Sequence, residues 1–331
     1  MTISLKRSLI AAALGLGIAA SGASAAAAQD KSYSIVTVVK LSGIAWFNRM
    51  EEGVKQFAKD TGNNATQVGA ATADSALQIQ LIEDLVARGV DAITVVPNSP
   101  QALEPVLKRA LDNNIVVIGH EGADLKNITY DVEAFDNKAY GEHLMKRLAE
   151  DMGEEGEYAV FVGYLTSNTH NQWVDAAIAY QKAHYPKMTL VVDKLESQEQ
   201  QQVAYQKTRE LLRTHPNLKG VQGSAGTDVV GAALAVEEAG LSGKVKIVGT
   251  SLPSIAGPYL GTEIDMISFW DPAKAGYAQD VLAVKALKKE PVKAGDDLGV
   301  EGYNDVKVDG KVVYGQAWVD VTEENADKYD F

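Results

Sequence analysis

Short apolar segments alternate with amphipathic segments of helical period along almost the whole chain, and this pattern runs through the sequence twice. In the first half, the apolar segments lie at 35–39, 66–70, 92–96, 115–118 and 128–132. In the second half, the pattern restarts with apolar segments at 158–162, 190–195, 220–222, 245–248 and 264–269. Strands that alternate with helices over short connections form parallel sheets through right-handed crossovers. The sequence therefore predicts an α/β fold with two Rossmann-like lobes, each built on a parallel sheet.

The two predicted lobes share the chain discontinuously. The chain is longer than a single hydrophobic core usually supports, which favours two lobes. No low-complexity segment separates the two halves, so we expect several strand-like hinge crossings and not one tether. We assign 31–133 plus 264–292 to an N-terminal lobe, and 134–263 plus 293–331 to a C-terminal lobe.

The first residues have the pattern of a secretory signal. Lys6 and Arg7 form a basic start, 9–20 is an apolar run, and 23–25 reads Ala-Ser-Ala, which matches a small-residue cleavage site. The apolar run is shorter than a membrane-spanning helix requires, and an uncleaved membrane anchor is the alternative. We predict a signal peptide at 1–25 and an exported, periplasmic chain. The sequence has no cysteine and so no thiol for a lipid anchor, which favours a free protein.

The charge of the chain restricts its partners. The formal net charge is −13, and removal of the leader with its two basic residues makes the exported chain more acidic still. Nucleic acid and anionic membranes are themselves negatively charged, so they are poor partners for this surface. We therefore expect no nucleic-acid partner, and we expect a monomer.

Aromatic and polar residues gather where the predicted strands end. Trp46, Trp173 and Trp270 each follow a predicted strand, and Lys40 directly follows the first one. In an open α/β sheet, ligands bind outside the carboxyl ends of the strands. The apolar faces of a sugar stack on aromatic rings, and its hydroxyls need both donors and acceptors. Such groups also follow the strands, at His120, Glu121, Asn168, His170, Asn171, Gln172, Thr227, Asp228, Ser251 and Asp271.

Each of these residues also has a purely structural alternative. A tryptophan can belong to the core, and His120 can pair with Glu121. Asn168 or Thr169 can cap the helix that follows, and Thr227 or Asp228 can do the same. Asp271 before a proline fits a helix N-cap, a role that does not prevent it from binding a ligand.

The sequence lacks the common catalytic and cofactor motifs. No nucleophile elbow, Walker loop or dinucleotide fingerprint follows any predicted strand. The five histidines show no metal-ligand spacing. We therefore predict no catalytic residue, no metal and no cofactor. An alternative is a carbohydrate enzyme that uses Glu121 and Asp271 as a pair of carboxylates.

Five motifs of the chain belong together: Val39-Lys40-Leu41 with Trp46-Phe47, Asn171-Gln172-Trp173-Val174, the segment 247–253, Phe269-Trp270-Asp271 and the terminal Asp-Lys-Tyr-Asp-Phe. With these motifs, the chain resembles the periplasmic solute-binding proteins of sugar ABC importers, the ribose-binding type I fold. Within that family, it is most similar to the branch of the rhamnose-binding and autoinducer-2-binding proteins. The resemblance covers essentially all of the exported chain.

The resemblance implies ligand contacts at the matching positions. With the aromatic residues, the candidate ligand-binding residues are Lys40, Trp46, Phe47, Glu121, Thr169, His170, Asn171, Ser224, Thr227, Trp270 and Asp271. Autoinducer-2 receptors of this branch carry Asp at the Glu121 position, Asp-Gln at Thr169-His170 and Pro-x-Ala near Ser224. This chain differs at all three sites, which favours a monosaccharide such as a pentose, a 6-deoxyhexose or a related polyol.

The function implied by the resemblance is delivery of this sugar to an inner-membrane ABC permease by hinge closure. The alternatives are an autoinducer-2-binding protein or a chemoreceptor ligand-binding protein, which share the fold and differ in ligand or partner. Repressors of the lactose-operon type share the same core. Here, however, an export signal stands where their DNA-binding helices would be.

Overall fold

The computed structural model of the protein describes residues 31–331, so the predicted signal peptide lies outside the described residues. The first sheet has the strand order β12-β13-β5-β4-β3-β1-β2. Its strands are β1 (Ser34–Val39), β2 (Asn64–Gly69), β3 (Ala92–Val95), β4 (Val116–His120), β5 (Tyr130–Glu133), β12 (Lys307–Asp309) and β13 (Val312–Tyr314). All neighbouring pairs are parallel except β12 with β13.

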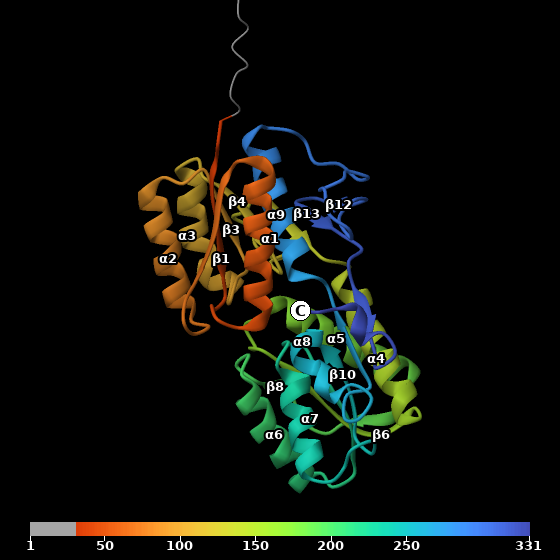
Figure 1. Cartoon of the computed structure of the whole chain (residues 1–331). Helices are drawn as coiled ribbons and strands as arrows, with labels where there is room; N and C mark the ends of the chain where they lie inside the picture. Colours follow the sequence, from red (N-terminus) through yellow and green to blue (C-terminus); the bar gives the residue numbers. More distant parts are fainter. Residues whose placement is uncertain (1–30) are drawn as a thin grey trace, which may run out of the picture. The chain divides into compact units, whose positions relative to one another are not determined.

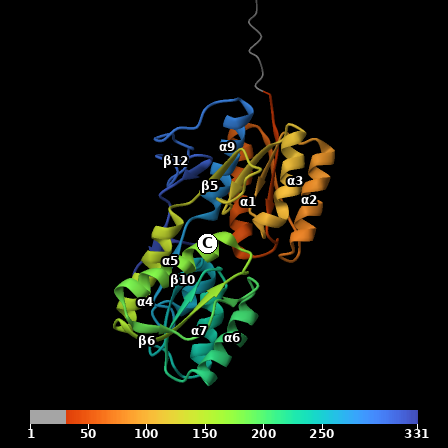
Figure 2. The same cartoon turned by 180° about the vertical axis from the view of Figure 1, so that it is seen from behind.

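Four helices cover the first sheet (Figure 1). They are α1 (Ala45–Thr61), α2 (Ser75–Arg88), α3 (Pro100–Asp112) and α9 (Pro272–Leu287). Helices α2 and α3 pack together on one face, and α1 and α9 pack together on the other, as both views show (Figures 1 and 2). Because both faces are covered, the central strands β1, β3 and β4 are buried along nearly their whole length, and every residue of Ile35–Val39 in β1 is buried.

The second sheet has the strand order β14-β11-β10-β9-β6-β7, and β8 pairs with β6 beside this path. Its strands are β6 (Glu155–Val162), β7 (Lys187–Leu190), β8 (Leu195–Glu196), β9 (Leu218–Gly223), β10 (Lys246–Thr250), β11 (Met266–Phe269) and β14 (Val319–Val321). Only β14 runs antiparallel to its neighbour. The helices are α4 (Asn137–Met152), α5 (Asn168–His184), α6 (Gln201–Thr214), α7 (Asp228–Glu238) and the short α8 (Pro253–Ala256).

The prediction of an α/β fold with two mainly parallel sheets is confirmed. Within residues 31–331, the chain passes between the sheets three times: after β5, after β11 and after β13. These segments are the strand-like crossings that the sequence predicted.

The predicted lobe boundaries are wrong at two places. Strand β11 was assigned with the N-terminal lobe, but it pairs with β10 in the second sheet. Strands β12 and β13 were assigned with the C-terminal lobe, but β13 pairs with β5 in the first sheet. The reason is that β12 and β13 are three residues long, and such short strands take their place from pairing with a distant strand, which periodicity does not encode.

A further difference lies at the predicted strand 190–195. In the structure, β7 ends at Leu190 and β8 begins at Leu195, with an irregular segment between them. Among the described residues, no helix combines the length and the apolar character needed to cross a membrane.

Candidate functional site

One cavity brings together most of the candidate ligand-binding residues. Those on its wall are Lys40, Trp46, Phe47, Glu121, His170, Ser224, Thr227 and Trp270. They come from both sheets. Lys40 follows β1 and Glu121 follows β4 in the first, whereas Ser224 follows β9 in the second. The carboxyl ends of parallel strands lie along one edge of a sheet, which is why residues so distant in sequence meet here.

Lys40 is the centre of the polar part of the cavity. Its Nζ lies 2.6 Å from Oε2 of Glu121 and 3.5 Å from Oε1 of Glu199. All three side chains are buried, with residue exposures of 3%, 6% and 7%. Lys40 and Glu121 belong to the first sheet, and Glu199 lies between β8 and α6 of the second. This ion-pair cluster therefore joins the two sheets across the cavity.

The electrostatics of the cluster favour a charged Lys40–Glu121 pair. Burial opposes the charge on Lys40, but Glu121 and Glu199 outweigh it and raise the pKa of Lys40 above its usual range. Burial also opposes the charge on Glu121, but the charge and the hydrogen bond of Lys40 outweigh it, so the pKa of Glu121 is lowered. For Glu199, burial dominates and its pKa is raised. Of the two carboxyl groups in the cluster, Glu199 is therefore the one whose pKa lies above the usual value.

Two buried histidines serve as neutral hydrogen-bonding groups. Burial lowers the pKa of His170 to about 3, and its Nδ1 accepts a hydrogen bond from the Gly163 amide at 3.1 Å. Burial also lowers the pKa of His120, whose Nδ1 lies 2.6 Å from the Val132 carbonyl oxygen. Because a carbonyl can only accept, His120 carries its proton on Nδ1. Its free Nε2 then accepts from Nε1 of Trp270 at 3.3 Å, which orients that indole.

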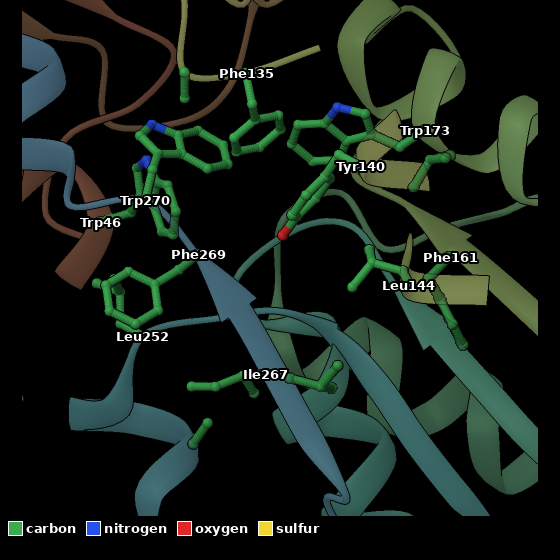
Figure 3. Packing of buried hydrophobic residues seen from close by; sticks show 14 of the residues in the cluster. Trp46, Phe135, Tyr140, Leu144, Phe161, Trp173, Leu252, Ile267, Phe269 and Trp270 are labelled. Carbon is green, nitrogen blue, oxygen red and sulfur yellow. The ribbon is translucent and has the colours of Figure 1, made fainter. Parts of the chain in front are cut away.

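The apolar wall of the cavity is part of an aromatic cluster (Figure 3). The rings of Trp46 and Trp270 meet edge to face, with centroids 4.7 Å apart and planes at 73°. Trp270 in turn contacts Phe135 at 5.3 Å and Trp173 at 5.7 Å between ring centroids. The indoles that line the cavity are therefore held by a second layer of rings behind them.

Trp173 belongs to that second layer and does not line the cavity. Only 1% of its surface is exposed, and its Nε1 donates to Oδ1 of Asn137 at 2.7 Å. Trp173 was not among the candidate ligand-binding residues, and of the two roles that the sequence left open for it, the structure shows the place in the core.

Thr169 and Asn171 lie next to His170 but not on the cavity wall. Successive residues of a helix point about 100° apart, so of these three only His170 faces the cavity. Thr169 is buried in the first turn of α5. The Asn171 amide donates to the Ser167 carbonyl at 2.8 Å and faces a separate hollow beside Leu165.

Asp271 also lies outside the cavity. Its carboxylate accepts two hydrogen bonds from Arg49, at 2.9 and 2.8 Å, and a third from the Ala273 amide at the start of α9. It is therefore a helix cap, as the sequence indicated, and it borders a different hollow. Glu121 and Asp271 do not share a cavity, so the carboxylate pair needed for the alternative carbohydrate enzyme is not assembled.

The cavity also contains residues that were not among the candidates. They are Ile44, Ala45, Glu199, Ala225, Gly226, Thr250, Leu252 and Ile255. Thr250 and Leu252 lie in or beside the segment 247–253 that carries the resemblance, so the sequence held a signal for them. No signal in the sequence indicated Glu199, because the residues around it predict only a regular strand followed by a helix.

Several polar atoms at the cavity have no hydrogen-bond partner among the described residues. They include Oγ of Ser224, Oγ1 of Thr227 and Oε1 of Glu199. Buried polar groups are normally paired, and an unpaired one costs free energy. The predicted capping by Thr227 is not observed, since its side chain makes no cap hydrogen bond. These hydroxyls and the carboxyl oxygen are available to a ligand.

No group of three or more histidine and carboxylate side chains is placed to hold a metal ion within residues 31–331. The chemistry of the cavity is therefore that of hydrogen bonds, one ion-pair cluster and aromatic surface. Such a lining suits a small molecule with apolar faces and several hydroxyls.

Residues 35–291 match the family model of the periplasmic binding protein domain. The chain belongs to this family. Among curated relatives, the D-ribose/D-allose-binding protein of Pseudomonas aeruginosa is 29% identical over 228 residues, covering 65% of this chain and 69% of the relative. The xylitol-binding protein of Mycolicibacterium smegmatis is 26% identical over 306 residues, covering 88% and 85%.

Solved structures of other proteins have the same fold. A solute-binding protein of an ABC transporter from Clostridium phytofermentas, solved with L-rhamnose, superimposes with a TM-score of 0.80 at 21% identity, over 90% of this chain and 98% of the other. LsrB of Clostridium saccharobutylicum, solved with AI-2, superimposes with a TM-score of 0.81 at 20% identity, over 90% and 100%. At these sequence identities, the structural similarity shows a shared fold.

Proposed function

We propose that this periplasmic binding protein delivers a monosaccharide to an inner-membrane ABC permease, the sugar being a pentose, a 6-deoxyhexose or a related polyol. The observation that carries the proposal is the mixed lining of the cavity. Two indoles, an ion-pair cluster and hydroxyls without a partner among the described residues line the same cavity. The relatives named above bind ribose, allose or xylitol, which supports this class of ligand.

Each part of the lining has a role toward a sugar. Trp46 and Trp270 offer apolar faces and edges for the C–H surface of the ring. The charged Lys40–Glu121 pair offers a donor and an acceptor, which suits adjacent hydroxyls of a polyol. Ser224 and Thr227 supply hydroxyls that lack a partner within residues 31–331. Thr169, Asn171 and Asp271 do not line the cavity, and we assign them structural roles in the segments that hold the lining residues.

The same arrangement supports hinge closure as the mechanism. Lys40 and Glu121 belong to the first sheet, and His170, Ser224 and Thr227 belong to the second, so only a ligand that contacts both groups favours the closed form. The cavity volume is about 40 Å³, which is room for about three water molecules. Admission of a sugar ring therefore requires the two sets of residues to move apart. The moving lobes in this proposal are the two sheets, each with its covering helices.

The experiment that tests this function is a thermal melting screen. The panel contains D-ribose, D-allose, D-arabinose, L-rhamnose, D-fucose, D-galactose, D-glucose and xylitol, followed by calorimetry on the sugars that raise the Tm. A ligand at several hundred times its Kd stabilises the folded state by about 3–4 kcal/mol. A panel in which no sugar or polyol raises the Tm contradicts the proposed ligand class. Uptake of the identified sugar by cells with and without this gene then tests delivery to a permease.

A further inference from the structure

Glu199 is held at the cavity by an unusual backbone. Gln198 and Glu199 both have left-handed backbone conformations, with φ of 58° and 54°. Such angles are uncommon for residues other than glycine. Two in succession cost free energy, which other contacts in the folded state must offset. The segment joins β8 to α6 and turns the Glu199 side chain inward, where the residue is 7% exposed. The backbone is therefore strained at the position where the Glu199 carboxyl group is buried.

A glycine on the neighbouring strand end makes room for this carboxyl. A Cβ at Gly163 would lie 2.8 Å from Cγ and 2.9 Å from Oε1 of Glu199. No side-chain carbon fits at these distances, so any larger residue would push the carboxyl away. Gly163 also donates its amide to His170, which places the carboxyl and the imidazole side by side at the cavity.

The charges that face the cavity do not balance. Lys40 supplies one cation, whereas Glu121 and Glu199 supply two carboxyl groups. His120 and His170 are neutral because burial lowers their pKa values. Asp228, at the start of α7, adds a further acidic group near Glu199. The single ammonium is already shared by Glu121 and Glu199, so it has little capacity to neutralise an additional anion.

We propose that Glu199 sets the charge class of the ligand, so that the closed site accepts neutral polyols and excludes sugar acids and sugar phosphates. Oε1 of Glu199 lies 3.5 Å from Nζ of Lys40 and makes no hydrogen bond with any described residue, and it accepts one from a hydroxyl of the neutral ligand. A carboxylate or phosphate of an acidic sugar would instead meet Glu199 in a buried, poorly solvated space, where repulsion between like charges is strong. This inference rests on the proposed function and specifies its ligand.

The test compares ligands that share a carbon skeleton and differ in charge. The matched sets are D-ribose with D-ribose 5-phosphate and D-ribonate, D-galactose with D-galacturonate, and xylitol with xylonate. Binding is measured by calorimetry at pH 7.5 on the wild-type chain. We expect the neutral member of each set that binds to do so about 100-fold or more tightly than its anionic partner. Equal binding of neutral and anionic members overturns the proposal.

Variants then attribute the selectivity to Glu199. For each set of ligands, the selectivity is the ratio of the affinity for the neutral member to the affinity for the anionic member. We expect Glu199→Gln to lower this ratio at least tenfold while the neutral sugar still binds. Glu290→Gln removes the same charge at an exposed position after α9 and should leave the ratio unchanged.

If Glu199→Gln fails to fold, Gly163→Ala displaces the carboxyl without removing it and should also lower the ratio of neutral to anionic affinity. An unchanged ratio in the folded variant shows that Glu199 does not set the charge class. Failure of every neutral and anionic ligand to bind contradicts the proposed function itself.

Discussion

The guanidinium carbon of Arg49 lies 3.9 Å from the centroid of the Phe331 ring, while the same guanidinium donates two hydrogen bonds to Asp271. The backbone carbonyl of Phe331 accepts a hydrogen bond from the Ser254 amide of α8 at 2.9 Å. Arg49 belongs to α1 on the first sheet, whereas α8 belongs to the second. Phe331 therefore contacts elements of both sheets, next to the crossing that follows β11.

Arg49→Ala removes this connection. The Asp271 carboxylate would keep its bond to the Ala273 amide but lose both bonds to the guanidinium. We expect the free energy of unfolding to fall by about 1–3 kcal/mol, since a bidentate charged pair and a contact between a cation and a ring are both lost. Urea denaturation measures the change. The control is Arg109→Ala, whose exposed pair with Glu83 should contribute less than about 0.5 kcal/mol. Equal effects of the two variants would contradict the assigned role of Arg49.

The two layers of the aromatic cluster should respond differently to substitution. Trp270 lines the cavity, and we expect Trp270→Ala to weaken sugar affinity by about 1–3 kcal/mol through lost stacking and burial. Trp173 lies behind it, and Trp173→Phe leaves Oδ1 of Asn137 without its donor. For Trp173→Phe, we expect a loss of about 1–3 kcal/mol in the free energy of unfolding, with sugar affinity unchanged. Calorimetry and urea denaturation on both variants separate the two effects.

Lys40 stabilises two buried carboxyl groups, so its removal should be costly. We expect Lys40→Met to lower the free energy of unfolding by about 3–5 kcal/mol, because Glu121 loses its 2.6 Å partner in a buried site. The double variant Lys40→Met with Glu121→Gln removes both charges of the pair and should recover part of that loss. A double-mutant cycle by urea denaturation measures the coupling. Additive losses in the cycle would show that the two charges do not depend on each other.

Asp228 should make stability depend on pH. Burial raises the pKa of Asp228 to about 7, whereas the unfolded chain has the ordinary value near 3.8. The folded state therefore binds the proton more tightly, and its stability falls as the pH rises from about 4 to about 7. Asp228→Asn removes this dependence and can still accept the amide hydrogen bonds of Ser224 and Ala225.

We expect Asp228→Asn to match the wild type at pH 4 and to exceed it increasingly as the pH rises. The gain approaches about 4 kcal/mol above pH 7, which corresponds to the full shift of the pKa. Urea denaturation at pH 4, 6 and 8 measures the difference. A gain that is constant across this range would mean that Asp228 does not titrate as described.

The sequence by itself determined the class of the fold and the end of the sheets at which a site could form. Apolar segments such as Ile35–Val39 are buried on both faces, and strands of this kind are typical of a parallel sheet that is covered by helices. Lys40 and Glu121 lie at the cavity, because a polar residue directly after such a strand lies at the carboxyl edge of its sheet.

Tertiary structure decided what local periodicity does not encode. Three features depend on contacts between distant segments: the position of β13 beside β5, the position of Trp173 behind Trp270 and outside the cavity, and the orientation of Asp271 toward Arg49. Glu199 is the clearest case. Its carboxyl reaches Lys40 only because two residues adopt left-handed angles and Gly163 leaves the space free. Alternation of apolar residues reports which face of an element is buried, but not which partner that face meets, and the partners define this site.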